Sequence, residues 1–346
     1  MTKRTRYFVF GSVSVLLVGL CTGLVAYYTG MPMGAFGQSS GLTELRYVPA
    51  SASVVAYADV RNLMQSELRQ KLHKADQNET DGQAEFQRET GIDIEHDIDR
   101  VVAFMEPNTG ADADADGYTG MIVATGRFDQ GRLEALARQH GGTVEDYNGK
   151  RLISKIASRG DHDRGGHYGG DHAASYPAKS MTVAFLESGV VAVGETAVVK
   201  RAIDRQGTDS VTANTELMAL VNDIDDSNAW AVGRFDALMS RARLPEGVAS
   251  QIPAVKLFSA SGHINGGLSA VIRAETRDDQ AAQNLRDVVQ GFLALARLQS
   301  NTQPELQILL NSLQLSGTGK TVALSFQVPS QVIDSLAEAK RKAAED

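Results

Sequence analysis

The chain has 346 residues, 42% hydrophobic and 22% charged, which is enough for a membrane-spanning segment plus one large or two small globular domains. Its formal net charge is −8, although Lys3, Arg4 and Arg6 all precede the first acidic residue, Glu44. The rest of the chain is therefore strongly acidic, which disfavours contact with phosphate backbones, and we expect no nucleic-acid partner. A single cysteine, Cys21, excludes intrachain disulfides and cysteine-rich metal sites.

The N-terminal segment predicts a transmembrane anchor. Residues 7–28 run for 22 positions without a charge, and a helix of that length is about 33 Å long, which matches the hydrocarbon core of a bilayer. Tyr27 and Tyr28 close the run where a cleavable signal peptide has small residues. Because the basic residues of 1–6 lie only before the anchor, we expect a single-pass protein of the inner (cytoplasmic) membrane. Residues 1–6 are then a cytoplasmic tail, and the C-terminal region lies in the periplasm or outside.

The region after the anchor is expected to hold two similar units. Residues 29–46 are predicted to form a flexible tether, because glycines and a proline dominate their first part. The first unit is then 47–225 and the second is 226–336, with a charged tail at 337–346. A groove between the two units is the default binding surface.

Each predicted unit begins with an apolar strand that ends at an aspartate. These strands cover 53–59 and 228–236, and Asp59 and Asp236 are expected to cap a following Leu-Met helix, which in the first unit runs from residue 60 to about residue 74. The further expected elements are strands at 101–105 and 120–129, a helix at 132–140, a hairpin at 181–194, a helix at 196–205, strands at 256–264 and 267–276, a helix at 278–298, a strand at 320–328 and a helix at 331–336. Hairpins and strand–helix–strand runs predict an α+β fold, a single transmembrane helix followed by two repeated antiparallel-sheet-plus-helix units.

One expected helix is strongly amphipathic. The helix over 278–298 places apolar side chains on one face, which predicts packing against a sheet; they are Ala281, Leu285, Val288, Val289, Phe292 and Ala296.

Several of these features together resemble a known family. They are the N-terminal anchor, the segment 47–59 (Tyr-Val-Pro-Ala-Ser-Ala-Ser-Val-Val-Ala-Tyr-Ala-Asp), the hairpin and helix over 184–204, and the strand through Trp230. The combination is similar to a family of uncharacterised membrane-anchored bacterial envelope proteins, a domain of unknown function. The resemblance implies an envelope location and a duplicated domain. It implies no activity, substrate or catalytic residue.

A loop rich in histidine and aspartate is the candidate metal site. Three histidines and three aspartates fall within 12 residues, and imidazole with carboxylate suits zinc, nickel or copper. The candidate ligands are Asp161, His162, Asp163, His167, Asp171 and His172. Five glycines between Gly160 and Gly170 raise the entropic cost of ordering this loop on a metal. An insertion without a ligand is therefore the alternative interpretation, and it is the one we favour.

Three other motifs lack a residue or a neighbouring element that their function requires. Residues 112–117 begin like a calcium loop, but the twelfth position, which needs a glutamate, is Val123. Residues 317–321 imitate the end of a phosphate-binding loop, but no helix is expected after them. Residues 37–41 match Gly-x-Ser-x-Gly without the strand-to-helix turn that the hydrolase motif requires.

The sequence therefore predicts a non-enzymatic, membrane-anchored envelope protein without a cofactor. Its role is expected to be binding or assembly, as an accessory subunit of a membrane complex for example. Its partners would be the bilayer, through residues 7–28, and an envelope or membrane protein. The alternative is a metal-dependent hydrolase or metal-responsive sensor that uses the loop at 161–172.

Overall fold

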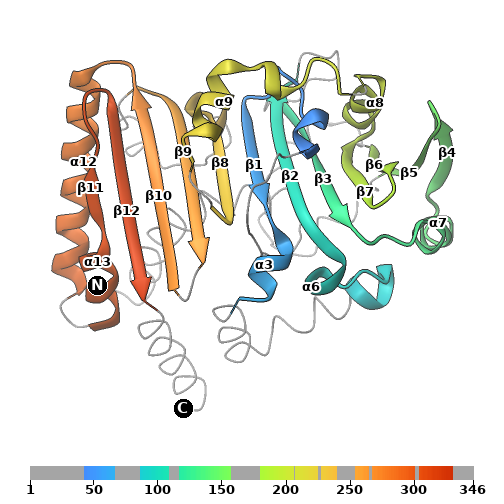
Figure 1. Cartoon of the computed structure of the whole chain (residues 1–346), viewed down its shortest axis with the longest axis horizontal. Helices are drawn as coiled ribbons and strands as arrows, with labels where there is room; N and C mark the ends of the chain where they lie inside the picture. The colour runs from blue at the N-terminus through green and yellow to red at the C-terminus, as the bar shows by residue number, and fades with distance from the viewer. Residues whose placement is uncertain are drawn as a thin grey trace, which may run out of the picture.

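The computed structural model describes residues 43–66, 86–108, 117–156, 180–205, 207–224, 227–239, 254–264, 267–300 and 304–329 (Figure 1). These residues build one antiparallel sheet of 12 strands in the order β11-β12-β10-β9-β8-β1-β2-β3-β7-β6-β5-β4.

The bounds of the strands are β1 (Val54–Ala58), β2 (Ile98–Pro107), β3 (Tyr118–Gly126), β4 (Thr143–Tyr147), β5 (Lys150–Ile156), β6 (Ser180–Glu187), β7 (Val190–Glu195), β8 (Ala229–Arg234), β9 (Val255–Ile264), β10 (Gly267–Thr276), β11 (Gln314–Ser316) and β12 (Thr321–Pro329). The helices are α3 (Val60–Met64), α6 (Ile94–Asp97), α7 (Gln130–Gln139), α8 (Thr196–Arg205), α9 (Thr215–Asn222), α10 (Phe235–Met239), α12 (Asp279–Gln299) and α13 (Pro304–Ser312), and two short 3-10 turns are η1 (Thr43–Tyr47) and η2 (Val211–Ala213).

The middle of the sheet joins the two halves of the chain. Strand β1 pairs with β2 on one side and with β8 on the other, so that Ala56 lies opposite both Ala103 and Ala231. Moving outwards from this centre, the first half runs β1-β2-β3-β7-β6 and the second runs β8-β9-β10-β12-β11. The first half then continues with β5 and β4.

The expected fold class is wrong. We expected an α+β fold in which a transmembrane helix precedes two repeated sheet-plus-helix units, whereas the described chain is mostly one continuous sheet with few helices. The pairing of β1 with β8 explains the difference. Two separate sheets would each present an unpaired edge at this point, and the backbone groups of both edges are satisfied by joining.

Strands β4, β5 and β11 and helices α6, α9 and α13 were not among the elements expected from the sequence. Helix α3 was expected from residue 60 to about residue 74, and the structure describes it only over Val60–Met64.

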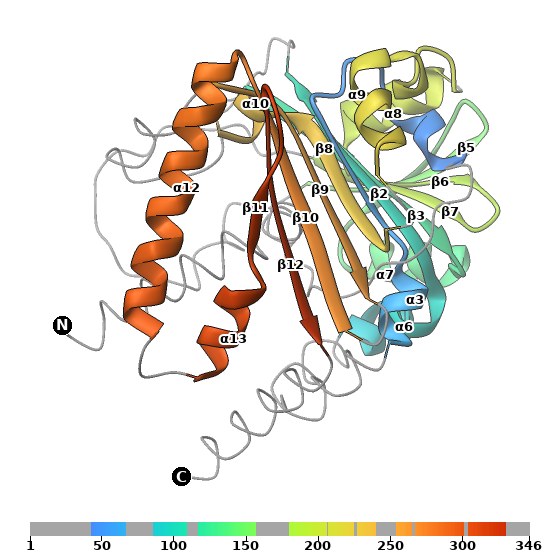
Figure 2. The ribbon, with the colours of Figure 1, turned by 60° about the vertical axis from the view of Figure 1, so that its left-hand side comes forward.

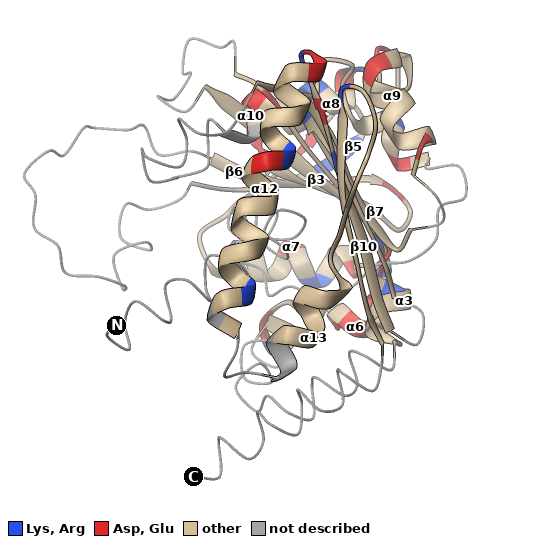
Figure 3. Cartoon of the chain, turned by 90° about the vertical axis from the view of Figure 1, so that its left-hand side faces the viewer, with Lys and Arg blue, Asp and Glu red and all other residues tan. Residues whose placement is uncertain are grey.

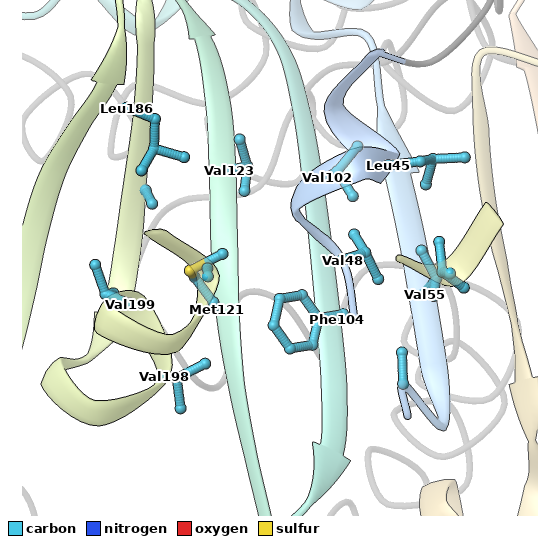
Figure 4. Packing of buried hydrophobic residues seen from close by; sticks show 14 of the residues in the cluster. Leu45, Val48, Val55, Val102, Phe104, Met121, Val123, Leu186, Val198 and Val199 are labelled. Atoms are coloured by element: carbon cyan, nitrogen blue, oxygen red, sulfur yellow. The ribbon is translucent and has the colours of Figure 1, made fainter. Parts of the chain in front are cut away.

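The main hydrophobic core covers one face of the first half of the sheet and of the adjoining strand β8. Helix α8 buries Val198, Val199, Ala202 and Ile203 against this face. The strands contribute inward side chains at every second position, as shown for Val102, Phe104, Met121 and Val123 in Figure 4. Residues of η1 and the following turn close the same core with Leu45 and Val48. This packing holds β1, β2 and β3 rigidly in place.

The opposite face carries the long helix of the second half. Figure 2 shows α12 and α13 on one side of the sheet and α8 and α9 on the other, and Figure 3 shows α10 on the side of α12. Helix α12 begins at Asp279, after the cap residue Asp278, and it buries Ala281 and Ala282. Its later apolar side chains were expected to pack against the sheet, but Phe292 remains 55% exposed.

The anchor predicted at 7–28 lies outside the described residues. Among the helices that the structure does describe, none has the length and apolar character needed to cross a membrane. The predicted tether reaches to residue 46, but residues 43–46 belong to η1, where Glu44 and Leu45 are buried.

Candidate functional site

A cleft of about 360 Å³ lies at the end of the sheet where β1 and β3 begin and β2 and β8 end. Its lining comes from five segments of the chain. It consists of Ala50, Ser51, Ala52, Ser53, Pro107, Tyr118, Asn214, Glu216, Leu217, Arg234 and Asp236. The lining includes residues from both predicted units, because Arg234 and Asp236 come from the second half and the other nine from the first.

The floor of the cleft depends on a close approach between β1 and β8. The Arg234 N–H donates to the carbonyl of Ser53, with N and O 2.8 Å apart. A Cβ atom on Gly233 would lie 2.6 Å from the same carbonyl oxygen, so only glycine allows the two strands to approach in this way. The glycine thereby fixes the position from which the Arg234 side chain starts.

One wall of the cleft is the first turn of α9. Asn214 caps this helix by accepting from the Leu217 N–H at 3.1 Å, which is the usual role of an asparagine at such a position. The amide nitrogen of Asn214 also donates to the carbonyl of Ala50 at 3.0 Å. These two bonds hold the helix start against the loop before β1 and place Glu216 in the cleft lining.

An ion pair provides the charged groups of the cleft. The guanidinium of Arg234 donates to both carboxylate oxygens of Asp236, with Nη2–Oδ2 at 3.3 Å and Nε–Oδ1 at 3.4 Å. Burial alone would raise the pKa of Asp236, but hydrogen bonds from Arg234 and from the Ala237 N–H lower it. Asp236 is therefore ionised at neutral pH. Both side chains are more than half exposed, so they remain accessible to a ligand.

Tyr118 lies beside this ion pair. Burial raises the pKa of its hydroxyl, and the negative charge of Asp236 raises it further, while Arg234 acts in the opposite direction. The hydroxyl therefore keeps its proton at neutral pH and can donate a hydrogen bond. Tyr118 opens β3, directly opposite Pro107 in the β2–β3 register.

A buried carboxylate stabilises the neighbouring loop. Glu106 is 4% exposed and accepts from Ser51 Oγ at 2.7 Å and from Arg201 Nη2 at 2.7 Å. Buried carboxylates require such partners, because an unpaired charge in the interior is costly. Through Ser51, this group connects α8 to the loop that lines the cleft.

The cleft combines groups suited to ligands with both charges. Arg234 can donate to a carboxylate or phosphate, whereas Asp236 and Glu216 can accept from an ammonium or guanidinium. Tyr118 and the loop residues add neutral hydrogen-bonding groups. Such a lining favours recognition of a polar partner that carries opposite charges near each other.

Sequence reasoning did not identify this site. The sequence predicts a strand over 228–236 and a helix cap at Asp236 equivalent to the one at Asp59. The structure confirms the cap at Asp59, which accepts from the Asn62 N–H at 3.1 Å. Asp236 instead lies in the first turn of α10 and pairs with Arg234. The only local signal was the Arg-x-Asp pattern at a strand end, and its partners lie far away in the sequence.

The candidate metal ligands cannot be placed. Asp161, His162, Asp163, His167, Asp171 and His172 lie outside the described residues, and so do the motif at 37–41 and residues 112–116 of the calcium-like loop. Within the described ranges, no group of three or more His, Cys, Asp or Glu side chains is arranged to hold a metal ion. The phosphate-loop imitation at 317–321 forms the turn between β11 and β12 and the first residue of β12.

Comparisons with known proteins give little further information. No protein-family model matches the chain, and no curated protein matches it. A solved structure of TP0453, in crystal form I, is similar with a TM-score of 0.43 and 8% sequence identity, and the match covers 88% of this chain and 100% of that one.

Proposed function

We propose that this chain is a non-enzymatic envelope protein that is anchored in the inner membrane and binds a partner through the cleft at Arg234 and Asp236. Support for the anchor comes from the uncharged run at 7–28 and the basic residues before it. Support for binding comes from the cleft, in which exposed, oppositely charged side chains stand on a rigid sheet end.

The single observation that carries the binding role is the accessible ion pair. A surface ion pair contributes little to stability, so a purely structural role gives little reason for its position in a cleft. A charged group of the partner can take the place of either Arg234 or Asp236 in the ion pair and bind the member that remains. We infer an envelope or membrane protein as the partner, contacting the cleft with a polar segment that contains both charges.

The binding role can be tested by site-specific photo-crosslinking of the full chain in its native membranes. A photoreactive residue at position 107, an exposed position in the cleft lining, should form a defined crosslinked species. Arg234→Gln in the same chain should reduce that species at least fivefold. The matched control is Arg277→Gln, which removes another exposed arginine paired with a nearby aspartate, Asp278 at 3.1 Å. Equal crosslinking in both variants would contradict the role of the cleft.

The anchor can be tested separately. The full chain should stay with the membrane pellet after alkaline carbonate washing, and a reporter fused after Asp346 should be active only outside the cytoplasm. Release by carbonate, or cytoplasmic reporter activity, would contradict the location without bearing on the cleft.

A further inference from the structure

Exposed large apolar side chains concentrate on one helical pair. Phe292, Leu295 and Leu298 on α12 are 55%, 52% and 71% exposed, and Ile308 on α13 is 45% exposed. Of the large apolar side chains that are exposed in the described part of the chain, only Met181 lies elsewhere. We refer to Phe292, Leu295, Leu298 and Ile308 as the apolar tip.

The apolar tip is also poor in charge. Residues 288–315 contain only two charged residues, Arg297 and Glu305. The first half of α12, in contrast, carries Asp279, Arg286 and Asp287, and Figure 3 shows this change of character along the helix. An apolar helix end with an isolated arginine, whose long side chain can extend towards polar surroundings, is typical of segments that contact lipid.

A second copy of the chain is a poor occupant for this surface. The four side chains together expose little more than the equivalent of two whole side chains, of the order of 400 Å². A stable interface between two proteins needs about 800 Å² from each partner. Contact with a lipid surface needs less buried area, because a neighbouring anchor already holds the protein at the membrane and so raises the effective concentration of lipid at this surface.

The position of the tip agrees with the predicted anchor. Helix α12 starts after the end of β10 and runs back along the sheet for 21 residues, so it ends towards the side where β10 and β2 begin. The ion pair between Glu44 and Arg100, at 3.0 Å, ties the first described residues to the early part of β2. Residues 29–42 can span at most about 50 Å. A bilayer that holds residues 7–28 therefore lies within reach of the apolar tip.

We propose that the apolar tip inserts into the surface of the same bilayer that holds residues 7–28, as a second, peripheral membrane contact; this inference rests on the anchoring proposed above. The contact holds α12 at the membrane. The cleft at Arg234 lies at the opposite end of the sheet, where β8 ends. It consequently faces away from the lipid and stays open to a partner.

The inference can be tested by lipid quenching of a fluorescent probe. The full chain, with Cys21→Ala to remove the native thiol, is reconstituted in phosphatidylcholine vesicles that contain doxyl-labelled phosphatidylcholine. A bimane probe is attached at Leu295→Cys in one sample. The matched control carries it at Gln283→Cys, an exposed polar position about 18 Å earlier on the same helix. We expect quenching at position 295 to be at least threefold greater than at 283.

A further variant tests the contribution of the tip itself. Leu298→Ser, at a side chain that is 71% exposed, should leave the melting temperature unchanged and reduce the quenching at position 295 by half or more. Equal quenching at positions 295 and 283 would overturn the inference. The inference would also be overturned, in favour of a second copy, if the unlabelled Leu295→Cys protein formed a disulfide-linked dimer and the labelled protein showed no lipid quenching.

The two proposals fail in different ways. If carbonate washing releases the chain from the membrane, the anchoring fails and the inference fails with it. If the chain resists carbonate but the probe at position 295 is not quenched, only the peripheral contact fails.

Discussion

Tyr57 and Trp230 stack across the central strand pair, with ring centroids 5.6 Å apart and an angle of 26° between the ring planes. They lie directly opposite each other in the β1–β8 register, and both are almost fully buried. Stacked aromatic side chains at paired positions are among the more stabilising cross-strand contacts. This contact joins the first half of the chain to the second at the centre of the sheet.

Replacing this tryptophan should destabilise the whole protein. We expect Trp230→Ala to lower the free energy of unfolding by about 3–5 kcal/mol, because it removes a large buried side chain and leaves a cavity beside Tyr57. Denaturant unfolding of the full chain would measure this. Phe292→Ala serves as the control, since it removes an exposed aromatic side chain and should change stability by no more than about 0.5 kcal/mol. Similar losses of unfolding free energy in both variants would mean that the buried stack contributes no more to stability than an exposed aromatic side chain does.

Gly233 should tolerate no side chain. In Gly233→Ala, the new Cβ would lie 2.6 Å from the Ser53 carbonyl oxygen and 2.9 Å from the Val54 Cα, so the strands must separate. A loss of about 1–3 kcal/mol is expected from such overpacking. Gly262→Ala on the neighbouring strand β9 is the matched control, because its Cβ would meet nothing closer than 3.9 Å. Thermal melts that rank the two variants in the reverse order would refute the close-approach argument.

Acid should weaken the attachment of α7 to the sheet through Glu134. Hydrogen bonds donated by Arg151, Gln130 and Arg138 lower the pKa of this carboxyl from 4.5 to about 2, although burial opposes the shift. A depressed pKa in the folded state stabilises the fold fully above pH 4.5, and this contribution is lost as the pH falls from 4.5 to 2.

The test is the pH dependence of unfolding in Glu134→Gln. The variant should be less stable than the wild type at pH 7, and the difference in free energy of unfolding should shrink steadily between pH 4.5 and pH 2. A difference that stays constant over this range would show that Glu134 does not titrate as proposed.

The first turn and the middle of α12 should respond differently to an introduced charge. Ala282 is fully buried, whereas Val288 is only half-buried. We therefore expect Ala282→Asp to destabilise by several kcal/mol and Val288→Asp by clearly less, because the second carboxylate keeps part of its hydration. Chemical denaturation of both variants measures the difference. An equal effect would mean that the middle of α12 packs against the sheet as closely as its first turn does, as the sequence pattern had suggested.

Local chemistry made several elements predictable. The helix expected at 196–205 is α8, and the helix expected at 278–298 is α12 within one residue at each end. Asp59 caps α3 as expected, because an aspartate at a strand end can accept from the first free N–H groups of a helix. The same reasoning failed at Asp236, since Arg234, two residues away, offers a stronger charged partner. A local pattern does not reveal which partner is the better one.

The sequence by itself determined the acidic character of the chain, the uncharged run at 7–28, and most of the strands through their alternating or apolar patterns. These properties depend on residues that are close together in the sequence and on hydrophobic patterns that repeat every two or 3.6 residues. Only the tertiary structure decided that β1 pairs with β8 to make one sheet, and that Arg234, Asp236, Tyr118 and Glu216 share a cleft. Strand pairing is made by backbone hydrogen bonds that every residue type except proline can both donate and accept, so the sequence does not specify which edges meet.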